Sequence, residues 1–211
     1  MSAGRSSATG GRRRRRSPEV AEQEIITAAE ELLRERPFRE LTVDEVMRRT
    51  DLSRPSFYVY FRDRHHLVLK VVERLTGESA DMADIWYRSE GTGRDVIHEA
   101  TTGVVAIFER HGAVMEALAD AAADDREVEL AYRTSQDFFI QATAKHIERE
   151  IEAGNMLPCN AAETARALCI MNENYLRTVL GRNPTVEPAR VVDTLTTIWI
   201  RTLYDDLAPS A

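Results

Sequence analysis

From Ser17 onward, apolar residues recur three and four positions apart along almost the whole chain. This is the period of an amphipathic α-helix, whereas a half-buried β-strand alternates apolar and polar residues. No segment of the sequence shows convincing strand alternation, and no unit repeats at a fixed period. Proline and glycine interrupt the helical pattern at intervals and mark the expected helix ends. The sequence therefore predicts an all-α protein.

Local signals set the expected helix boundaries. Pro18 suits the first turn of a helix capped by Ser17, and Pro37 stops that helix. Thr42 and Glu45 have the spacing of a capping box, which begins a second helix. The expected helices cover residues 17–36, 42–50, 53–60, 65–89, 94–109, 112–122, 125–154, 160–181 and 188–206.

Charge is distributed unevenly along the chain. The 211 residues have a formal net charge of −7. Residues 1–16 contain six arginines and no acid, and they lack an apolar period, so we expect a disordered arm. A three-helix unit at residues 17–64 follows, and a six-helix body at residues 65–211 holds most of the acidic residues. A basic end on an acidic body leaves that end free to bind a polyanion.

The sequence excludes several classes of protein. No run approaches the about 18 apolar residues of a membrane helix. The arginine run is followed by polar residues and a proline, so it does not begin a signal peptide. Cys159 and Cys169 form no C-x-x-C motif, which favours a reduced, cytoplasmic protein. Because metal-ligand spacings, a phosphate-binding glycine loop and a G-x-S-x-G motif are absent, we expect no metal, cofactor or enzymatic activity.

The second and third expected helices are joined by a tight turn of about three residues, the spacing of a helix-turn-helix. In such a unit the later helix lies in the DNA major groove, and its first residues reach base edges. Phe57 and Phe61 stand four positions apart and share the face expected to pack on the first two helices. Arg54, Ser56 and Val59 face elsewhere.

Two segments carry a family resemblance, namely LTVDEV and LSRPSFYVYFRDRHHL, within residues 20–70. They resemble the DNA-binding domain of TetR-type transcriptional repressors through an S-x-x-[ST]-[FL]-Y-x-[YH]-F core, Thr42 and a basic residue before a leucine. The family joins a helix-turn-helix to a six-helix domain for effector binding and dimerisation, and the resemblance implies the same organisation here. The segments ADMA, MNE and VDTLTTIW are similar to one branch of that family.

This sequence departs from the family pattern at two positions beside the expected recognition helix. Asp51 stands in the turn where many members have glycine, and Asp tolerates a left-handed backbone better than most residues. Arg64 stands where lysine is usual, which keeps the positive charge at the start of the next helix. A helix N-terminus is itself an anion site, so we expect phosphate to bind there.

The resemblance implies a set of DNA contacts. The residues concerned are Thr42, Arg54, Ser56, Tyr58, Val59, Tyr60 and Arg64. Arg54, Ser56 and Val59 would face bases, since an arginine can bind guanine O6 and N7 together, although Arg54 could instead meet only phosphate. The other four would contact the DNA backbone, although Tyr58 could simply pack in the core. The Arg12–Arg16 run could enter a minor groove or remain a solvated, non-specific tail.

The resemblance also implies a ligand pocket in the C-terminal body. Its expected lining is Ile97, Val104, Phe108, Tyr132, Phe139, Thr143, Met171, Asn172 and Trp199. Asn172 is the informative member, because an amide on a buried helix needs a hydrogen-bond partner. A ligand carbonyl or a neighbouring helix could supply that partner. Cys169 and Arg177 depart from the branch that the chain resembles, so the ligand itself is not implied.

Three hypotheses about function follow. The first is a homodimeric repressor that binds a near-palindromic operator in double-stranded DNA and is released by a small apolar effector. The expected dimer helices carry Ala162, Ala165, Leu168, Leu176, Val191, Val192, Leu195, Ile198, Thr202 and Leu203, which could alternatively serve the chain's own core. The second is a small-molecule binding protein with a vestigial DNA-binding unit, and the third is a non-specific DNA-coating protein driven by the arginine arm.

Overall fold

The computed structural model describes residues 17–88 and 93–204, with the backbone alone at residues 78, 79 and 81–88. The described residues form helices and no strand, which confirms the all-α prediction. The elements are α1 (Pro18–Glu35), a 3₁₀ turn η1 (Phe38–Glu40), α2 (Val43–Arg48), α3 (Arg54–Tyr60), α4 (Arg64–Arg88), α5 (Gly93–Asp124), α6 (Arg126–Glu152), α7 (Ala161–Leu180) and α8 (Pro188–Leu203). The predicted arm at residues 1–16 lies outside the described residues.

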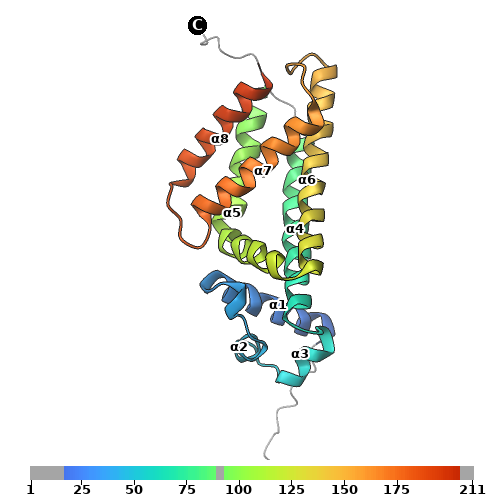
Figure 1. Ribbon diagram of the computed structural model, residues 1–211, viewed down its shortest axis with the longest axis vertical. Coiled ribbons are helices and arrows are strands. Elements are labelled where there is room, and N and C mark those ends of the chain that lie inside the picture. Colours follow the sequence, from blue (N-terminus) through green and yellow to red (C-terminus); the bar gives the residue numbers. More distant parts are fainter. Residues whose placement is uncertain (1–16, 89–92, 205–211) are drawn as a thin grey trace, which may run out of the picture.

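The helices divide into a small unit at one end of an elongated molecule and a larger body (Figure 1). Helices α1, α2 and α3 form the small unit, and α4 leaves it to run alongside α6 through the body. Helix α5 packs against both α6 and α8, and α7 packs against α6. None of the described helices is long and apolar enough to cross a membrane.

The expected capping signals operate at the starts of the first two helices. The Ser17 hydroxyl accepts a hydrogen bond from the Val20 amide at 3.4 Å. The Thr42 hydroxyl accepts from the Glu45 amide at 3.3 Å and donates to the Glu45 carboxylate at 2.7 Å. These bonds satisfy amides that a helix N-terminus otherwise leaves without partners, so both predicted starts are confirmed.

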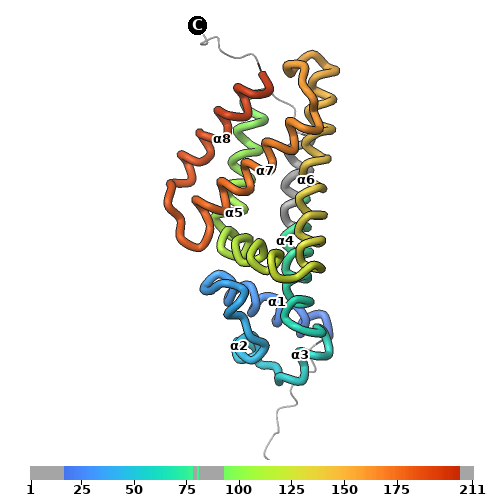
Figure 2. The backbone as a smooth tube through the Cα atoms, viewed as in Figure 1, coloured from blue at the N-terminus to red at the C-terminus, as the bar shows by residue number. Residues whose placement is uncertain are grey.

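Helix α5 corrects one prediction. The sequence predicted two helices, at residues 94–109 and 112–122, whereas Gly93–Asp124 is one α-helix. Its course bends between the green and yellow-green parts of the tube in Figure 2. Gly112 lies inside this helix, and a Cβ at this position would collide with the backbone carbonyl of Leu180 at the end of α7. The glycine therefore permits a close approach of two helices rather than a turn.

One hydrophobic core joins the small unit to the body. Phe57 and Phe61 of the α3 region are 0% and 1% exposed, which confirms that this face packs inward. The same cluster of buried residues contains Leu67 of α4, and Val114 and Leu118 from the second half of α5. The core of the small unit therefore continues beyond residue 64, the boundary expected from the sequence.

A buried ion pair fixes α1 against α4 within this core. Glu30 is 1% exposed, and its carboxylate is paired with the guanidinium of Arg74. Arg34 lies 3.8 Å from the same carboxylate. A charge withdrawn from water is tolerated only when it is paired in this way, so the pair specifies how the two helices meet.

Candidate DNA-binding surface and ligand cavity

Helices α2 and α3 are joined by a turn that side chains hold in place. The Thr50 hydroxyl donates to the Met47 carbonyl at 2.9 Å and accepts from the Leu52 amide at 3.2 Å. The Asp51 amide donates to the Glu24 carboxylate of α1 at 2.9 Å. Gly154 alone among the described residues has a positive φ, so Asp51 needs no left-handed backbone. The turn therefore accepts aspartate without the cost expected from the family pattern.

The outer face of α3 presents the side chains expected to face bases. Val59 is 75% exposed, and Tyr58 is 55% exposed rather than packed in the core. The Arg54 side chain is 59% exposed, and its Nε lies 3.0 Å from the Asp44 carboxylate of α2. Ser56 is half-buried, and its hydroxyl lies 2.9 Å from that of Ser53. An exposed ion pair of this kind is weak enough to be exchanged for a DNA contact.

The side chains expected to contact the DNA backbone differ in their exposure and in their contacts within the chain. Thr42 is exposed, while Tyr60 is half-buried and packs against the core. Arg64 lies with its guanidinium carbon 4.7 Å from the centre of the Phe38 ring. It also donates to the backbone carbonyls of Arg39 and Leu41, at 3.3 and 3.2 Å. Arg64 therefore ties α4 to the η1 segment, a structural role that the sequence alone did not indicate.

Asp63 occupies the N-terminus of α4, where the sequence predicted an anion site. Its carboxylate accepts hydrogen bonds from the amides of His65 and His66, each at 2.9 Å. These bonds hold the pKa of Asp63 below its usual value. The chain's own carboxylate therefore satisfies these two amides of the helix N-terminus, and the expected phosphate contact depends on the Arg64 side chain.

The body contains a cavity of about 650 Å³ that opens to the surface and is lined by residues from α5, α6, α7 and α8. Eight of the nine side chains expected from the sequence line this cavity. These are Ile97, Val104, Phe108, Tyr132, Phe139, Thr143, Asn172 and Trp199. A volume of this size, with apolar walls and a few polar groups, is typical of a small-molecule site.

Met171 is the exception among the residues expected to line the cavity. It packs against two hydrophobic clusters of the body instead. Cys169, Asn172, Glu173 and Leu176 line the cavity from α7, at the helical spacing of three and four residues. Met171 is one position from Asn172, which turns its side chain by about 100° around the helix axis. The structure therefore places Met171 against the core of the body rather than among the described lining residues.

A polar contact in the cavity wall supplies the hydrogen-bond partner that was expected for the Asn172 amide. The indole Nε1 of Trp199 donates to the Asn172 amide oxygen at 3.0 Å, so α8 supplies the expected partner. Thr101 of α5 and Thr196 of α8 are also joined through their hydroxyls, at 2.7 Å. Trp199 and Thr101 line the cavity, so its shape is set by side chains that hold α8 against α5 and α7.

Sequence reasoning missed the carboxylate in the cavity wall. Glu173 accepts hydrogen bonds from the Tyr132 hydroxyl and the Gln136 amide, both from α6. Burial and the charge of Glu173 raise the pKa of Tyr132, so the phenol keeps its proton and donates it. Burial likewise raises the pKa of the Cys169 thiol, whose sulfur lies 3.6 Å from the Thr143 hydroxyl. The spacing of Cys169, Asn172 and Glu173 was the signal that could have placed all three together.

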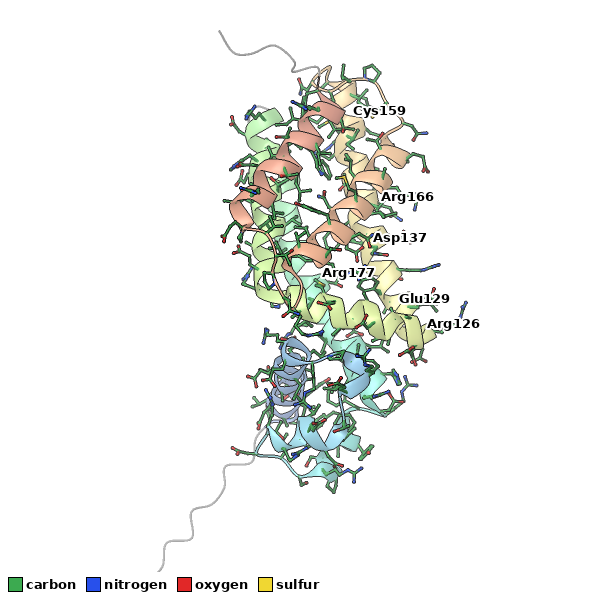
Figure 3. All side chains as sticks on the ribbon, turned by 60° about the vertical axis from the view of Figure 1, so that its left-hand side comes forward. Arg126, Glu129, Asp137, Cys159, Arg166 and Arg177 are labelled. Atoms are coloured by element: carbon green, nitrogen blue, oxygen red, sulfur yellow. The ribbon has the colours of Figure 1, made fainter. Side chains whose placement is uncertain are left out.

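The residues expected at a dimer interface serve mainly the chain's own core. Those buried within this chain are Ala165, Leu168, Leu176, Val191, Val192, Leu195 and Leu203. Ile198 is half-buried, whereas Ala162 and Thr202 are exposed. Ile170 is 44% exposed, and Arg166 extends outward from the same helix (Figure 3). An outer face of α7 and α8 therefore remains at the surface of the single chain.

Besides α4 and the shared core, contacts of Arg62, Arg182 and α5 join the cavity-bearing body to the small unit among the described residues. The Arg62 guanidinium lies 2.7 Å from the Glu127 carboxylate at the start of α6. In the α7–α8 loop, the Arg182 amide donates to Glu116 of α5 at 2.8 Å, and the Arg182 guanidinium donates to the Leu33 carbonyl of α1 at 3.4 Å. Helix α5 itself lines the cavity and then packs on α1. A change in the cavity can thus reach the small unit through continuous contacts.

Comparison with known proteins agrees with this architecture. Residues 25–71 match the family model described as bacterial regulatory proteins, tetR family. Residues 97–205 match the model described as the C-terminal domain of the transcriptional regulator EthR. The first match covers the helix-turn-helix, and the second covers the helices that line the cavity.

Relatives of similar length share both parts. The chain is 34% identical over 204 residues to the HTH-type transcriptional regulator EthR of Mycobacterium tuberculosis, covering 93% of each protein. It is 29% identical over 205 residues to the regulator of the same name from Mycolicibacterium smegmatis, covering 94% of this chain and 93% of that protein. These proteins are named as transcriptional regulators and not as enzymes, in line with the expectation from the sequence.

Solved structures share the fold at lower identity. FadR from Bacillus subtilis, determined with stearoyl-CoA, has a TM-score of 0.72 at 10% identity, covering 83% of this chain and 96% of that chain. The regulatory protein TetR from Rhodobacter sphaeroides has a TM-score of 0.68 at 20% identity, covering 87% and 99% of the two chains. From its two domain matches and its similarity to EthR over most of its length, the chain belongs to the TetR family of bacterial transcriptional regulators.

Proposed function

We propose that this regulator is a dimeric repressor that leaves its operator when a small, mainly apolar molecule fills the cavity. The observation that carries the proposal is the course of α5, which lines the cavity along its first half and belongs to the core of the small unit along its second half. FadR of Bacillus subtilis, determined with stearoyl-CoA, supports an elongated ligand for a fold of this kind.

On DNA, α3 would lie in the major groove with Arg54, Ser56 and Val59 toward the bases. The exposure of Arg54 and Val59 supports this orientation, as does the burial of Phe57 on the opposite face. On binding DNA, Arg54 would leave its ion pair with Asp44 and bind a guanine. That contact is worth about 1–3 kcal/mol of discrimination against other bases. Tyr58, Tyr60, Arg64 and Thr42 would position the unit on phosphates. The division into residues 17–64 for DNA and 65–211 for ligand and dimer follows from these roles.

The dimer would form through the outer faces of α7 and α8, giving a four-helix contact. Ala162 and Ile170 on α7, with Thr194 and Thr197 on α8, are exposed residues without a formal charge. A two-fold axis there would place two α3 helices about one turn of DNA apart, roughly 34 Å, on a near-palindromic operator.

A ligand would act by favouring one arrangement of the two recognition helices over another. A molecule with equal affinity for both arrangements shifts nothing, so the effector must bind the released arrangement more tightly. Because α5 lines the cavity, a ligand bound there would contact the same helix that packs against α1.

The DNA-binding part is tested by selecting operators from a pool of random duplexes and measuring affinity by fluorescence polarisation. We expect one near-palindromic sequence to be enriched and to resist competitor DNA. Arg54→Ala should weaken binding to that sequence by about tenfold to a hundredfold, with little effect on random duplexes. Equal affinity for all duplexes, abolished by deletion of residues 1–16, would instead support non-specific coating through the arm.

The dimer is tested by sedimentation equilibrium. We expect Thr197→Arg, which places two like charges across the proposed axis, to yield monomers with weaker operator binding. Thr134→Arg is the matched control, because it adds the same charge to an exposed position of α6. A dimer that survives Thr197→Arg unchanged would exclude this face.

A further inference from the structure

The cavity has mainly apolar walls, but titratable side chains also line it. Glu173 and Glu99 are the carboxylates among them, and His98 is the third titratable group besides the tyrosine and the thiol. Among the described lining residues there is no lysine or arginine. The remaining wall is largely aliphatic and aromatic, with Val104, Ile107 and Phe108 from α5. A ligand in the cavity would therefore contact apolar surface and negatively charged carboxylates.

Glu173 keeps its charge accessible despite its hydrogen bonds. Both of its donors, the Tyr132 hydroxyl and the Gln136 amide, are neutral groups, so neither cancels the charge. A carboxylate can accept about four hydrogen bonds, which leaves acceptor capacity for a further donor. The two side chains from α6 therefore hold the carboxylate in place without filling its capacity to accept hydrogen bonds.

The nearest cation on the same helix does not occupy the cavity. Arg177 lies one turn beyond Glu173 on α7 and extends from the part of that helix nearer the small unit (Figure 3). Its guanidinium donates to the Asn174 side chain at 2.9 Å, and Asn174 is exposed. Arg177 does not line the cavity. Among the lining residues that the structure describes, no cation faces Glu173, so a positively charged ligand group would find the carboxylate available.

We propose that the effector is an amphipathic amine, whose protonated nitrogen binds Glu173 while its apolar body fills the space against α5 and α6. This inference rests on the proposed ligand response and specifies the class of ligand. An ammonium group offsets the cost of enclosing a carboxylate, whereas a hydroxyl offers only a neutral hydrogen bond. A ligand carboxylate would be repelled by Glu173, so anionic fatty acids are disfavoured.

The test compares three ligands that share a ten-carbon chain and differ only in the head group: decylamine, decanol and decanoate. Isothermal titration calorimetry on the full-length protein at neutral pH gives each affinity. We expect decylamine to bind about tenfold to a hundredfold more tightly than decanol, and decanoate to bind most weakly. In Glu173→Gln the advantage of decylamine should fall to within about twofold, while decanol keeps its affinity.

Glu99→Gln is the matched control. It removes the same charge from an exposed position at the cavity, where water screens the interaction, so the preference for decylamine should persist. Equal binding of decylamine and decanol, or an equal loss in both variants, would overturn the assignment of Glu173. If decanol binds and releases the operator without any preference for the amine, only this inference fails. If none of the three binds, the proposed response to cavity ligands fails with it.

Discussion

Asp63 illustrates how a single side chain can set the start of a helix and make it sensitive to pH. Its carboxylate accepts from two amides of the first turn of α4, and these bonds lower its pKa. A group whose pKa is lowered on folding stabilises the native state above its unfolded pKa, near 3.9. That contribution is lost as the pH falls through the folded value.

We therefore expect Asp63→Ala to lower the free energy of unfolding by about 1 kcal/mol at neutral pH. The difference from the native protein should shrink as the pH falls below about 4, because protonation removes the same cap. Urea denaturation at a series of pH values measures both effects. Asp63→Asn, which keeps an acceptor at this position, should recover most of the loss at neutral pH. A cost that does not change with pH would contradict this account.

Asn172 gives a second prediction at this scale. Its amide oxygen is the acceptor for the Trp199 indole, and Trp199 is 6% exposed. Asn172→Ala should therefore cost about 1 kcal/mol, since it removes this hydrogen bond between α7 and α8. Thermal denaturation measures the loss, and Asn172→Asp is the control because it retains an oxygen acceptor. An unchanged melting temperature for Asn172→Ala would show that the bond contributes nothing to stability.

The same residues show what the sequence could predict about the site. The family resemblance placed Asn172 and Trp199 among the residues expected at the cavity, and both line it. The resemblance could not reveal that these two side chains bond to each other, since that depends on how α7 and α8 pack. Nor could it reveal that Met171, implied by the same resemblance, packs against two hydrophobic clusters of the body.

At the scale of the helix, two glycines in similar sequence contexts have opposite consequences. Gly112 of α5 and Gly77 of α4 both lie inside helices. A Cβ at Gly112 would collide with the Leu180 carbonyl, whereas a Cβ at Gly77 meets no atom within 4 Å. The sequence predicted a break between residues 109 and 112, beside this glycine, whereas the close approach of α7 explains a glycine inside the helix.

We expect the same substitution to act in opposite directions at these positions. Gly112→Ala should destabilise the fold by about 1–3 kcal/mol, because the new methyl group must displace backbone. Gly77→Ala should stabilise it by about 0.5–1 kcal/mol through helix propensity. Urea denaturation of the two variants, each compared with the native protein, measures both. Stabilisation by Gly112→Ala would show that α5 and α7 can separate at no cost.

At the scale of the whole molecule, Arg182 joins parts of the chain that are far apart in sequence. It connects the α7–α8 loop to α5 through Glu116 and to α1 through the Leu33 carbonyl. Its side chain is 18% exposed, so solvent only partly screens these contacts. We infer that Arg182 transmits part of any rearrangement of the body to the small unit.

Arg182→Ala should accordingly leave ligand affinity nearly unchanged but reduce, several-fold, the loss of operator affinity that the ligand causes. Fluorescence polarisation of a labelled operator, with and without the best-binding ten-carbon probe, measures this coupling. Arg190→Ala removes the same charge from an exposed position on α8 and should behave as the native protein. Equal coupling in both variants would show that Arg182 does not transmit the rearrangement.

The core that continues across residue 64 limits how such regulators can be recombined. Phe57 and Phe61 share buried surroundings with Leu67 and with Val114 and Leu118 from the distant part of α5. A chimera that grafts residues 17–64 onto a foreign sensing body would expose this apolar surface unless the new body reproduced it. The DNA-binding unit is therefore not an interchangeable cassette, and a functional exchange must carry the matching segment of α5 with it.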